Sequence, residues 1–234
     1  MPKESSVVIT GANKGIGFEA AKQLLQKGYR LFVTARRKEE GQKAAVQLAQ
    51  SGGKVQFVYL DVTDPESVKK AAREIGAQTE SLNALINNAG IFPDGETSIL
   101  NVDQTLMQKS FLTNTVGAVL VTQALWPLLA RSRPGRVVNV SSGLGALSDM
   151  GAVAPSYSIS KTALNAVTRQ FADALRDKGI IVNSVCPGWV RTDMGGPNAP
   201  RTVEEGAAGL VWAATEAPAE LTGNFLRDGK VIPW

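Results

Sequence analysis

Short runs of β-branched and apolar residues alternate with longer segments of helical periodicity along the chain, and this alternation constrains the fold more than any other feature. Several of the runs lack an alternating polar face, which is typical of parallel strands covered on both sides. Strictly alternating strands and helices predict a doubly wound parallel sheet with right-handed crossovers. The predicted strands are residues 6–10, 30–35, 55–60, 84–87, 136–141, 180–185 and 223–227.

The helical segments complete the pattern. In the first of them Ile16, Ala20 and Leu24 repeat at helical spacing, and Gly28 follows where a left-handed helix end needs no Cβ. No internal repeat, low-complexity tract or linker interrupts the alternation. We therefore expect residues 1–234 to form a single α/β domain, with one doubly wound, Rossmann-type parallel sheet of seven strands and helices on both faces. The predicted helices are residues 17–27, 38–50, 65–78, 103–129, 155–178 and 202–215.

A glycine-rich segment joins the first predicted strand to the first predicted helix. It reads T-G-A-N-K-G-I-G from Thr10 to Gly17. Glycines at such a junction allow a tight turn and a close approach of the backbone to a pyrophosphate, which free N–H groups at the helix N-terminus stabilise. An ordinary glycine-rich turn is the alternative, but the position between a strand and an amphipathic helix favours a dinucleotide. The residues expected to contact it are Gly11, Asn13, Lys14, Gly15, Ile16 and Gly17.

The end of the second predicted strand distinguishes between the two nicotinamide cofactors. NAD enzymes of this architecture place an acidic residue there for the ribose 2′-hydroxyl, whereas this chain has Ala35 followed by Arg36 and Arg37, with Lys14 in the glycine-rich segment. A guanidinium binds a 2′-phosphate with paired hydrogen bonds, and an acid would repel it. Taken alone, the basic pair could equally be a solvated helix start. At this position it predicts NADPH/NADP+ rather than NAD(H), with Arg36 as the main contact.

Two further strand ends carry residues that we expect to contact the cofactor. Asp61 and Val62 follow the third strand, and Asn88, Ala89 and Gly90 follow the fourth. A carboxylate can accept a hydrogen bond from the adenine amino group, and a glycine lets the ribose approach closely. As isolated features both segments would be ordinary turn chemistry. Their place at the carboxyl ends of successive strands is what favours binding.

Histidine is absent from the chain, and Cys186 is its only cysteine. These counts exclude histidine-containing nucleophilic triads, histidine-ligated metal sites and an intramolecular disulfide. We accordingly predict no metal site. Any acid–base chemistry must come from Tyr, Lys, Asp or Glu.

Tyr157 and Lys161 stand four residues apart in a predicted helix and therefore share one face. An ammonium beside a phenol stabilises the phenolate, so we expect the pKa of Tyr157 to fall below its usual value of about 10. A surface pair is the alternative. Ser142, at the end of the preceding strand, could hydrogen-bond the same substrate oxygen as Tyr157. Asn114 lies within a long predicted helix, where its side chain could hold a water, interrupt the backbone ladder or simply be exposed.

Together these motifs resemble the short-chain dehydrogenase/reductase family over the whole chain, in the family's order and approximate spacing. The segments T-A-R (34–36), V-V-N-V-S-S (137–142) and P-G-W-V-R-T-D-M (187–194) look particularly like its NADPH-dependent carbonyl reductase branch. The residues that carry the resemblance are Thr10 to Gly17, Asn87 to Gly90, Asn114, Ser142, Tyr157, Lys161, Pro187 and Gly188.

The resemblance implies an oxidoreductase that reduces a small-molecule ketone or aldehyde to an alcohol with NADPH. Tyr157 would protonate the carbonyl oxygen as hydride arrives from the nicotinamide, and Ser142 would polarise that oxygen, with Ser141 as a rival for this role. Lys161 would bind the nicotinamide ribose and tune Tyr157, and Asn114 would position a relay water. The resemblance further implies cofactor contacts from Tyr157, Lys161, Pro187, Gly188, Val190 and Thr192.

Two other functions stay open at this point. One is a 3-oxoacyl carrier-protein reductase of fatty-acid synthesis, whose acidic partner could dock on Arg131, Arg133 or Arg176, although these arginines also read as a solvated helix end. The other is a non-catalytic NADP(H)-binding sensor, which the presence of both Tyr157 and Lys161 disfavours. The substrate is not identified, and the loops at residues 144–154 and 195–201 are expected to line its pocket.

Charge and hydropathy bear on partners and location. Lys and Arg (25) are scattered among Asp and Glu (21), so we expect no nucleic-acid partner. The most apolar stretch, residues 116–130, is broken by polar residues and a proline, and we expect it to be too short to span a bilayer. A cytoplasmic location without membrane association follows. The chain resembles a family in which many members pair the helices corresponding to 103–129 and 155–178 between subunits, and it lacks the long insertion before the tyrosine of the animal monomeric carbonyl reductases. The resemblance therefore implies a homodimer or homotetramer.

Overall fold

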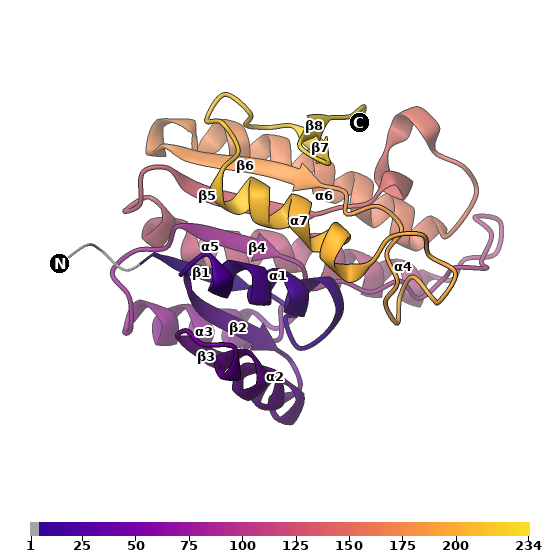
Figure 1. Ribbon diagram of the computed structural model, residues 1–234. Coiled ribbons are helices and arrows are strands. Elements are labelled where there is room, and N and C mark those ends of the chain that lie inside the picture. Colours follow the sequence, from indigo (N-terminus) through magenta and orange to yellow (C-terminus); the bar gives the residue numbers. More distant parts are fainter. Residues whose placement is uncertain (1–4) are drawn as a thin grey trace.

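The computed structural model describes residues 5–234, which form one sheet with helices on both faces (Figure 1). The strand order is β3-β2-β1-β4-β5-β6-β7-β8, with β1 to β7 parallel. Because the chain winds outward in both directions from β1 and β4, the doubly wound α/β fold is confirmed. The first four residues of the predicted domain lie outside the described range. The parallel strands are β1 (Ser6–Ile9), β2 (Arg30–Ala35), β3 (Val55–Tyr59), β4 (Ala84–Asn87), β5 (Gly135–Val140), β6 (Ile180–Val185) and β7 (Phe225–Arg227).

The expected number of seven strands is wrong by one, because a short hairpin adds β8 (Lys230–Val231) antiparallel to β7. The two strands are joined by Asp228 and Gly229, whose φ angles are 51° and 73°. An Asp-Gly pair with positive φ at both residues suits a tight two-residue hairpin. β8 has only 2 residues, too few to show the alternation from which a strand is predicted.

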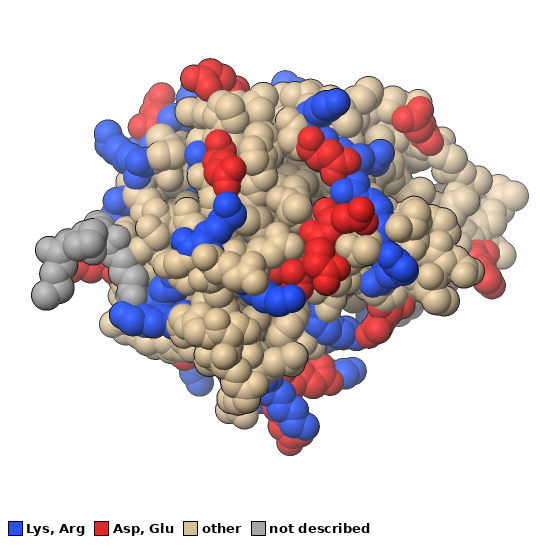
Figure 2. Space-filling model, viewed as in Figure 1, with Lys and Arg blue, Asp and Glu red and all other residues tan. Residues whose placement is uncertain are grey.

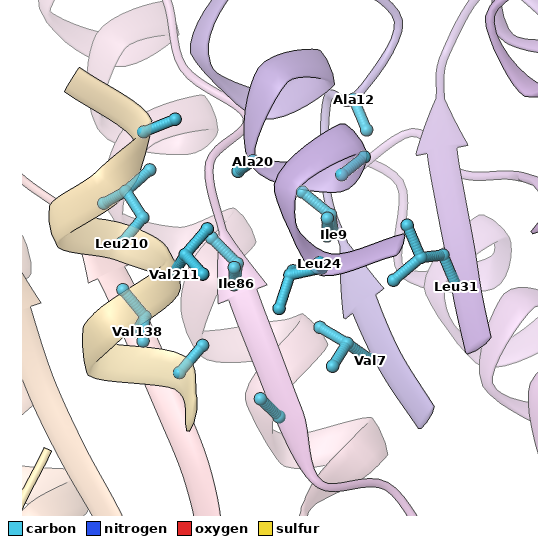
Figure 3. Packing of buried hydrophobic residues seen from close by; sticks show 14 of the residues in the cluster. Val7, Ile9, Ala12, Ala20, Leu24, Leu31, Ile86, Val138, Leu210 and Val211 are labelled. Carbon is cyan, nitrogen blue, oxygen red and sulfur yellow. The ribbon is translucent and has the colours of Figure 1, made fainter. Parts of the chain in front are cut away.

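The helices form two layers, with α1, α2 and α7 on one face of the sheet and α3, α5 and α6 on the other (Figure 1). Within β1, Val7 and Ile9 belong to the core under α1 and α7, whereas Val8 belongs to the opposite core, because successive strand residues point to opposite faces. Figure 3 shows the first core, where Leu24 of α1 and Leu210 of α7 meet the strands. The helices are α1 (Gly15–Gln26), α2 (Lys38–Gln50), α3 (Pro65–Gly76), α4 (Gln104–Phe111), α5 (Gly117–Leu129), α6 (Pro155–Ala174) and α7 (Val203–Thr215).

The helix expected at residues 103–129 is interrupted by a π-helical turn. α4 ends at Phe111, the turn spans Leu112–Val116, and α5 begins at Gly117. Asn114 lies at the centre of the turn and is buried. A five-residue turn is too short to disturb the apolar periodicity from which the helix was predicted, and such turns are frequent at functional sites.

The helical run Gln104–Leu129 has 26 residues, and its most apolar 18-residue part has a mean hydropathy of 1.3, so by length and composition alone it could cross a membrane. The apolar stretch at residues 116–130 that was expected to be too short covers only the second part of this helix, which begins well before it. However, 56% of its most apolar part is buried inside the protein. Val121, Leu125 and Leu129 pack in the core with β4 and α3. This packing accounts for the apolar character of the helix.

Charged side chains of both signs lie next to one another over the face shown in Figure 2, without a broad area of a single sign. This mixture is that of an ordinary solvated surface.

Candidate active site

One large cavity opens at the carboxyl ends of the parallel strands, where doubly wound sheets bind their ligands. Its volume is about 1170 Å³, above the roughly 300–1,000 Å³ of a typical small-molecule site. It therefore has room for a dinucleotide together with a second small molecule. Gly17 and Asn114 do not line it. The predicted site residues that do are Gly11, Asn13, Lys14, Gly15, Ile16, Arg36, Arg37, Asp61, Val62, Asn88, Ala89, Gly90, Ser142, Tyr157, Lys161, Pro187, Gly188, Val190 and Thr192.

The side chain of Asn88 holds the glycine-rich loop against the loop that follows β4. Asn88 Nδ2 donates to the carbonyls of Thr10 and Gly11, each at 2.9 Å. The backbone N–H groups of Asn88 and Ala89 both donate to Thr10 Oγ1 at 3.0 Å. A Cβ at Gly17 would collide with the Asn88 amide. Gly17 therefore acts by allowing this close packing rather than by lining the cavity.

Two glycines determine the backbone conformation of the loop that leads into α1. Gly11 and Gly15 have φ angles of 63° and 59°, which residues with a Cβ rarely adopt. The residue preceding α1 is Lys14, and its side chain makes no capping hydrogen bond. The first-turn N–H groups are thus left without a side-chain acceptor. A pyrophosphate fits this arrangement, because it would accept hydrogen bonds from those groups and interact with the helix dipole.

The two arginines that follow β2 differ in their partners. Arg36 is exposed and forms no ion pair within residues 5–234. Arg37 Nη1 donates to Glu40 Oε1 at 2.7 Å, and Asn13 Nδ2 donates to Glu40 Oε2 at 3.0 Å. The hydrogen bond from Arg37 lowers the pKa of Glu40, which stays ionised. Arg36 is therefore the cation at this end of the cavity that can bind a phosphate without losing another partner.

Lys14 joins the glycine-rich loop to the loop after β6. Its Nζ lies 2.6 Å from Asp193 Oδ2, and the two side chains are 65% and 78% exposed. The hydrogen bond from Lys14 lowers the pKa of Asp193. Exposed pairs of this kind contribute about 0–1 kcal/mol, so a phosphate can replace Asp193 at little cost.

Asp61 and Val62 line the cavity after β3. Asp61 Oδ1 accepts from the backbone N–H of Thr63 at 2.9 Å and from its hydroxyl at 2.7 Å. This is the turn chemistry that the sequence left as an alternative, and it leaves the other carboxylate oxygen available to a ligand. Val62 packs under α5, where a Cβ at Gly117 would lie 2.8 Å from Val62 Cγ2.

Tyr157 and Lys161 share one face of α6 and line the cavity together, but their ionisation differs from the expectation. Both are buried, and Lys161 Nζ donates to the Val140 carbonyl at 2.7 Å while lying 5.7 Å from the centroid of the Tyr157 ring. Burial raises the pKa of Tyr157 to about 12, against an opposing hydrogen bond with Ser142. Burial lowers the pKa of Lys161 to about 8. The predicted fall in the Tyr157 pKa is wrong for this arrangement, because desolvation of the phenolate outweighs an ammonium that points elsewhere.

Asn114 does not line the cavity, but its side chain forms hydrogen bonds that hold two of the surrounding segments in place. Its Oδ1 accepts from the Ile91 N–H at 2.8 Å, and its Nδ2 donates to the Ile91 carbonyl and to Ser160 Oγ, each at 3.0 Å. Ser160 Oγ in turn donates to the Tyr157 carbonyl at 2.7 Å. Asn114 is buried, which excludes the exposed alternative. The helix is interrupted by the π turn that contains Asn114, but the partners of its side chain are Ile91 and Ser160 rather than the helix backbone.

The two serines after β5 have different partners. Ser141 Oγ donates to Asn165 Oδ1 at 2.7 Å and is buried. Ser142 Oγ accepts from the Leu144 N–H at 3.2 Å, and it is close enough to Tyr157 to oppose the effect of burial on the Tyr157 pKa. Since the proton of Ser141 is committed to Asn165, Ser142 is the serine whose hydroxyl proton can be offered to a ligand beside Tyr157.

The segment after β6 forms another wall of the cavity. Gly188 has a φ of 81°, and a Cβ there would lie 2.6 Å from Arg201 Cδ. Val190 is buried and pairs with Arg201 in an isolated bridge. Thr192 Oγ1 donates to the Val190 carbonyl at 3.3 Å and accepts from the Gly195 N–H at 3.1 Å. Pro187, Gly188, Val190 and Thr192 are thereby held against one side of the cavity.

The loops expected to form the substrate pocket contribute less than predicted. Of residues 144–154 and 195–201, only Leu144 and Gly195 line the cavity. Ala146 instead packs with Cys186 and Phe225 in a small separate core. Ala146 is therefore buried in this core and does not line the cavity.

Two residues near Tyr157 were not anticipated. The ring of Phe92 meets the Tyr157 ring edge to face, with centroids 4.7 Å apart. Asp94 is buried, and its Oδ2 accepts from the Ser156 N–H at 2.6 Å, in the first turn of α6. The residue before α6 is Ala154, with a φ of 48° and no side chain that can cap the helix. Asp94 supplies that cap from 62 residues away, a distance at which no local sequence signal exists.

The assembled residues fit a dinucleotide phosphate at one end and acid–base chemistry at the other. A glycine cradle, an uncapped helix N-terminus and a free arginine lie at the β1–β2 end. A buried phenol, an ammonium and a serine hydroxyl lie at the β5–α6 end. Chemically, the second group can deliver a proton to an oxygen bound between Ser142 and Tyr157.

Comparison with known proteins gives consistent matches. A family model described as short chain dehydrogenase matches residues 5–202. The short-chain dehydrogenase anuI of Penicillium roqueforti is 36% identical, over 97% of this chain and 95% of its own length. Carbonyl reductase (NADPH) 1 of Rattus norvegicus is 31% identical over 97% of each chain, in an alignment of 274 positions that includes residues absent here. The crystal structure of an NADPH-bound carbonyl reductase from chicken fatty liver has a TM-score of 0.91 at 33% identity, covering 99% of this chain and 95% of that one.

Proposed function

Since this chain belongs to the short chain dehydrogenase family, we propose that it is an NADPH-dependent carbonyl reductase that converts a ketone or aldehyde to an alcohol. The observation that carries the proposal is that Tyr157, Lys161 and Ser142 line the same cavity as the glycine-rich loop, at its other end. NADPH, when bound, supplies the hydride. The similarity to carbonyl reductases, one of them solved with NADPH, supports the same reaction here.

Tyr157 is the proposed general acid. With a pKa of about 12 its hydroxyl stays protonated at neutral pH, as a proton donor in the reducing direction requires. Ser142, whose hydroxyl is not committed to another side chain in the way that Ser141 is, would orient the carbonyl oxygen toward Tyr157. The proton passes from Tyr157 to that oxygen as hydride reaches the carbonyl carbon.

Lys161 and Asn114 have supporting roles in this proposal. The Lys161 ammonium would bind the nicotinamide ribose and replenish the proton on Tyr157. Asn114 lies close enough for the two to act together, because a Cβ at Gly90 would be 3.3 Å from Asn114 Oδ1 and 3.5 Å from Lys161 Nζ. Asn114 is also a positioning residue, because it holds Ile91 and, through Ser160, the Tyr157 backbone. The predicted relay water remains a prediction.

NADPH is preferred over NADH in this proposal because of the charges after β2. Arg36 is free to bind the 2′-phosphate, and Lys14 can exchange Asp193 for it. We expect R36A to raise the KM for NADPH by about 10–100-fold, the usual worth of a charge-assisted pair, and to change the KM for NADH little. An equal effect on both cofactors would contradict the assignment.

The decisive experiment is a panel of ketones and aldehydes assayed with NADPH and NADH, using the wild type and Y157F. We expect turnover with NADPH and a loss of about 10²–10⁴-fold in kcat for Y157F, with the Kd for NADPH unchanged. Undiminished activity in Y157F would refute the mechanism and favour a cofactor-binding sensor.

No specific observation favours the carrier-protein reductase. Arg131 donates to the Glu80 carbonyl and Arg176 pairs with Asp173, which is how a solvated helix end behaves. Comparing turnover of a 3-oxoacyl carrier protein with that of small ketones separates the two functions.

We also propose that the protein works in the cytoplasm as a homodimer or homotetramer. Leu112 and Val116, in the turn between α4 and α5, are 43% and 38% exposed. These apolar side chains suit contact with a second copy. Light scattering at micromolar concentration tests this, and a monomer mass would reject it.

A further inference from the structure

Arg227, the last residue of β7, lies far from the cofactor end of the cavity, which is the end formed by the glycine-rich loop and the residues after β2. β7 is four strands away from β1 in the sheet, which at about 4.8 Å a strand corresponds to roughly 19 Å. A Cβ at Gly143, the residue after Ser142, would be 2.7 Å from Arg227 Nη2. Arg227 also lines the cavity together with Ser142 and Tyr157. Its guanidinium therefore belongs to the end where the carbonyl is reduced.

The Arg227 guanidinium has no carboxylate partner among residues 5–234. Nη2 donates to the Cys186 thiol at 3.1 Å, and Nε is buried without any hydrogen-bond partner. The neighbouring Asp228 is not available, because its two oxygens accept from Arg201 at 2.7 and 3.0 Å. Arg227 is thus a half-buried cation that lacks a counter-ion.

The other acids around the cavity do not compensate Arg227 either. Glu40 is held by Arg37, Asp61 by Thr63, and Asp193 by Lys14. A partly desolvated charge without a partner is costly, and an anionic ligand that pairs with it recovers that cost.

We propose that Arg227 binds the carboxylate of the substrate, so that the carbonyl compounds this enzyme prefers are oxo acids or carboxylated aldehydes. This inference rests on the proposed reductase function and specifies its substrate class. The adjacency of Gly143 to Ser142 places the carboxylate within a few bonds of the carbonyl group. Apolar side chains of Leu144, Trp189 and Met194 line the same cavity and are exposed to it, which suits an apolar frame between the two groups.

The experiment compares 3- and 4-carboxybenzaldehyde with their methyl esters, which keep the aldehyde and the ring but remove the charge. In the wild type with NADPH, we expect kcat/KM for at least one acid to exceed that of its ester by about tenfold. R227Q, which keeps a donor for the Cys186 thiol, should lower kcat/KM for the acid about tenfold more than for the ester, so that this preference is lost. R227K should retain part of it. R73Q, which removes an exposed guanidinium on α3, is the matched control and should behave like the wild type.

Three results would overturn the inference while leaving the reductase function intact: equal kcat/KM for acid and ester in the wild type, equal losses for both in R227Q, or a weakened Kd for NADPH in R227Q. The last would assign Arg227 to the cofactor. If no aldehyde is reduced, the proposed function itself fails. Calorimetric titration of benzoate into the protein with NADP+ then decides the matter, since binding that is lost in R227Q supports the carboxylate site and absence of binding rejects it.

Discussion

Two lysines line the same cavity and differ in their physical surroundings. Lys14, in the glycine-rich loop, is exposed and contacts Asp193 on the surface. Lys161, on α6, is 4% exposed and donates to a backbone carbonyl. An exposed pair is screened by water and salt and is readily exchanged, whereas burial displaces the pKa of Lys161 to about 8. The cofactor end therefore depends on the conformation of the backbone and on charges that can change partner. The chemical end, formed by Ser142, Tyr157 and Lys161, depends on buried groups held in place by packing.

The two ends also differ in how they are assembled. The glycine cradle is one continuous segment, Thr10 to Gly17, whose conformation is set by its own glycines. At the chemical end, Asn114, Ser160 and Asp94 join the loop after β4, the π turn and α6. Lys161 joins α6 to the end of β5. Substitutions at the chemical end should consequently have larger effects, because each one disturbs several segments.

The sharpest test of this contrast replaces each lysine by methionine. K161M should lower kcat/KM for carbonyl reduction by about 10²–10⁴-fold, since it removes a group proposed to act on Tyr157 and the nicotinamide ribose. It should keep the protein folded, because an apolar side chain suits a buried position. K14M should raise the KM for NADPH by less than about tenfold and leave kcat unchanged. Steady-state kinetics measures both, and similar effects would break the contrast.

The pH profile should report the buried pair. Because the pKa of Lys161 is about 8 and that of Tyr157 about 12, kcat/KM should fall above pH 8, by about tenfold a unit, as Lys161 loses its proton. K161R, which keeps its charge, should move this decline to higher pH. A decline that stays near pH 8 in K161R would assign the titration to another group.

The shifted pKa values of Lys161 and Tyr157 make the free energy of unfolding change with pH in opposite directions. The folded pKa of Lys161 lies below its ordinary value of 10.5, so the unfolded chain binds more protons between about pH 8 and 10.5 and stability rises with pH there. The folded pKa of Tyr157 lies above its ordinary value of 10.0. Its stabilising contribution is complete below pH 10 and is lost as pH rises toward 12. Urea unfolding of the wild type, K161M and Y157F across this range tests both signs.

Two aspartates allow a comparison of helix caps at the two ends. Asp94 caps α6 from a buried position, whereas Asp64 caps α3 at the surface through the Glu66 N–H. We expect D94A to lower the free energy of unfolding by about 2 kcal/mol and D64A by about 0.5–1 kcal/mol. D94N, which keeps an acceptor, should recover part of the loss. Urea denaturation provides the values, and a larger effect for D64A would reverse the comparison.

The smallest expected effect concerns Glu40 at the cofactor end. E40Q removes the charge that holds Arg37, leaving a second guanidinium for the 2′-phosphate. The Kd for NADPH should decrease about two- to fivefold, within the range of an exposed ion pair, and the Kd for NADH should stay the same. E39Q on the same helix is the matched control. Fluorescence titration of both cofactors measures the change, and a weaker affinity for NADPH would show that Glu40 supports the site instead.

Much of the molecule followed from local sequence patterns. The doubly wound α/β fold and most strand bounds could be predicted because apolar periodicity and turn residues act over a few positions. The sequence also identified the glycine-rich loop, the i,i+4 spacing of Tyr157 and Lys161, and the absence of histidine. Each of these depends on nearby residues or on composition alone.

Only the tertiary structure decided how these parts act on one another. The π turn at Asn114, the cap from Asp94 and the uncompensated charge of Arg227 all depend on segments far apart in the chain. The shift in the pKa of Tyr157 is the clearest example of a property that depends on tertiary structure. The spacing of Tyr157 and Lys161 predicts a lowered pKa, but burial raises it, and burial exists only once the sheet, α6 and the loop after β4 have packed together. Spacing along the chain sets which groups are near neighbours, whereas solvent exclusion, which governs their charge, is a property of the assembled fold.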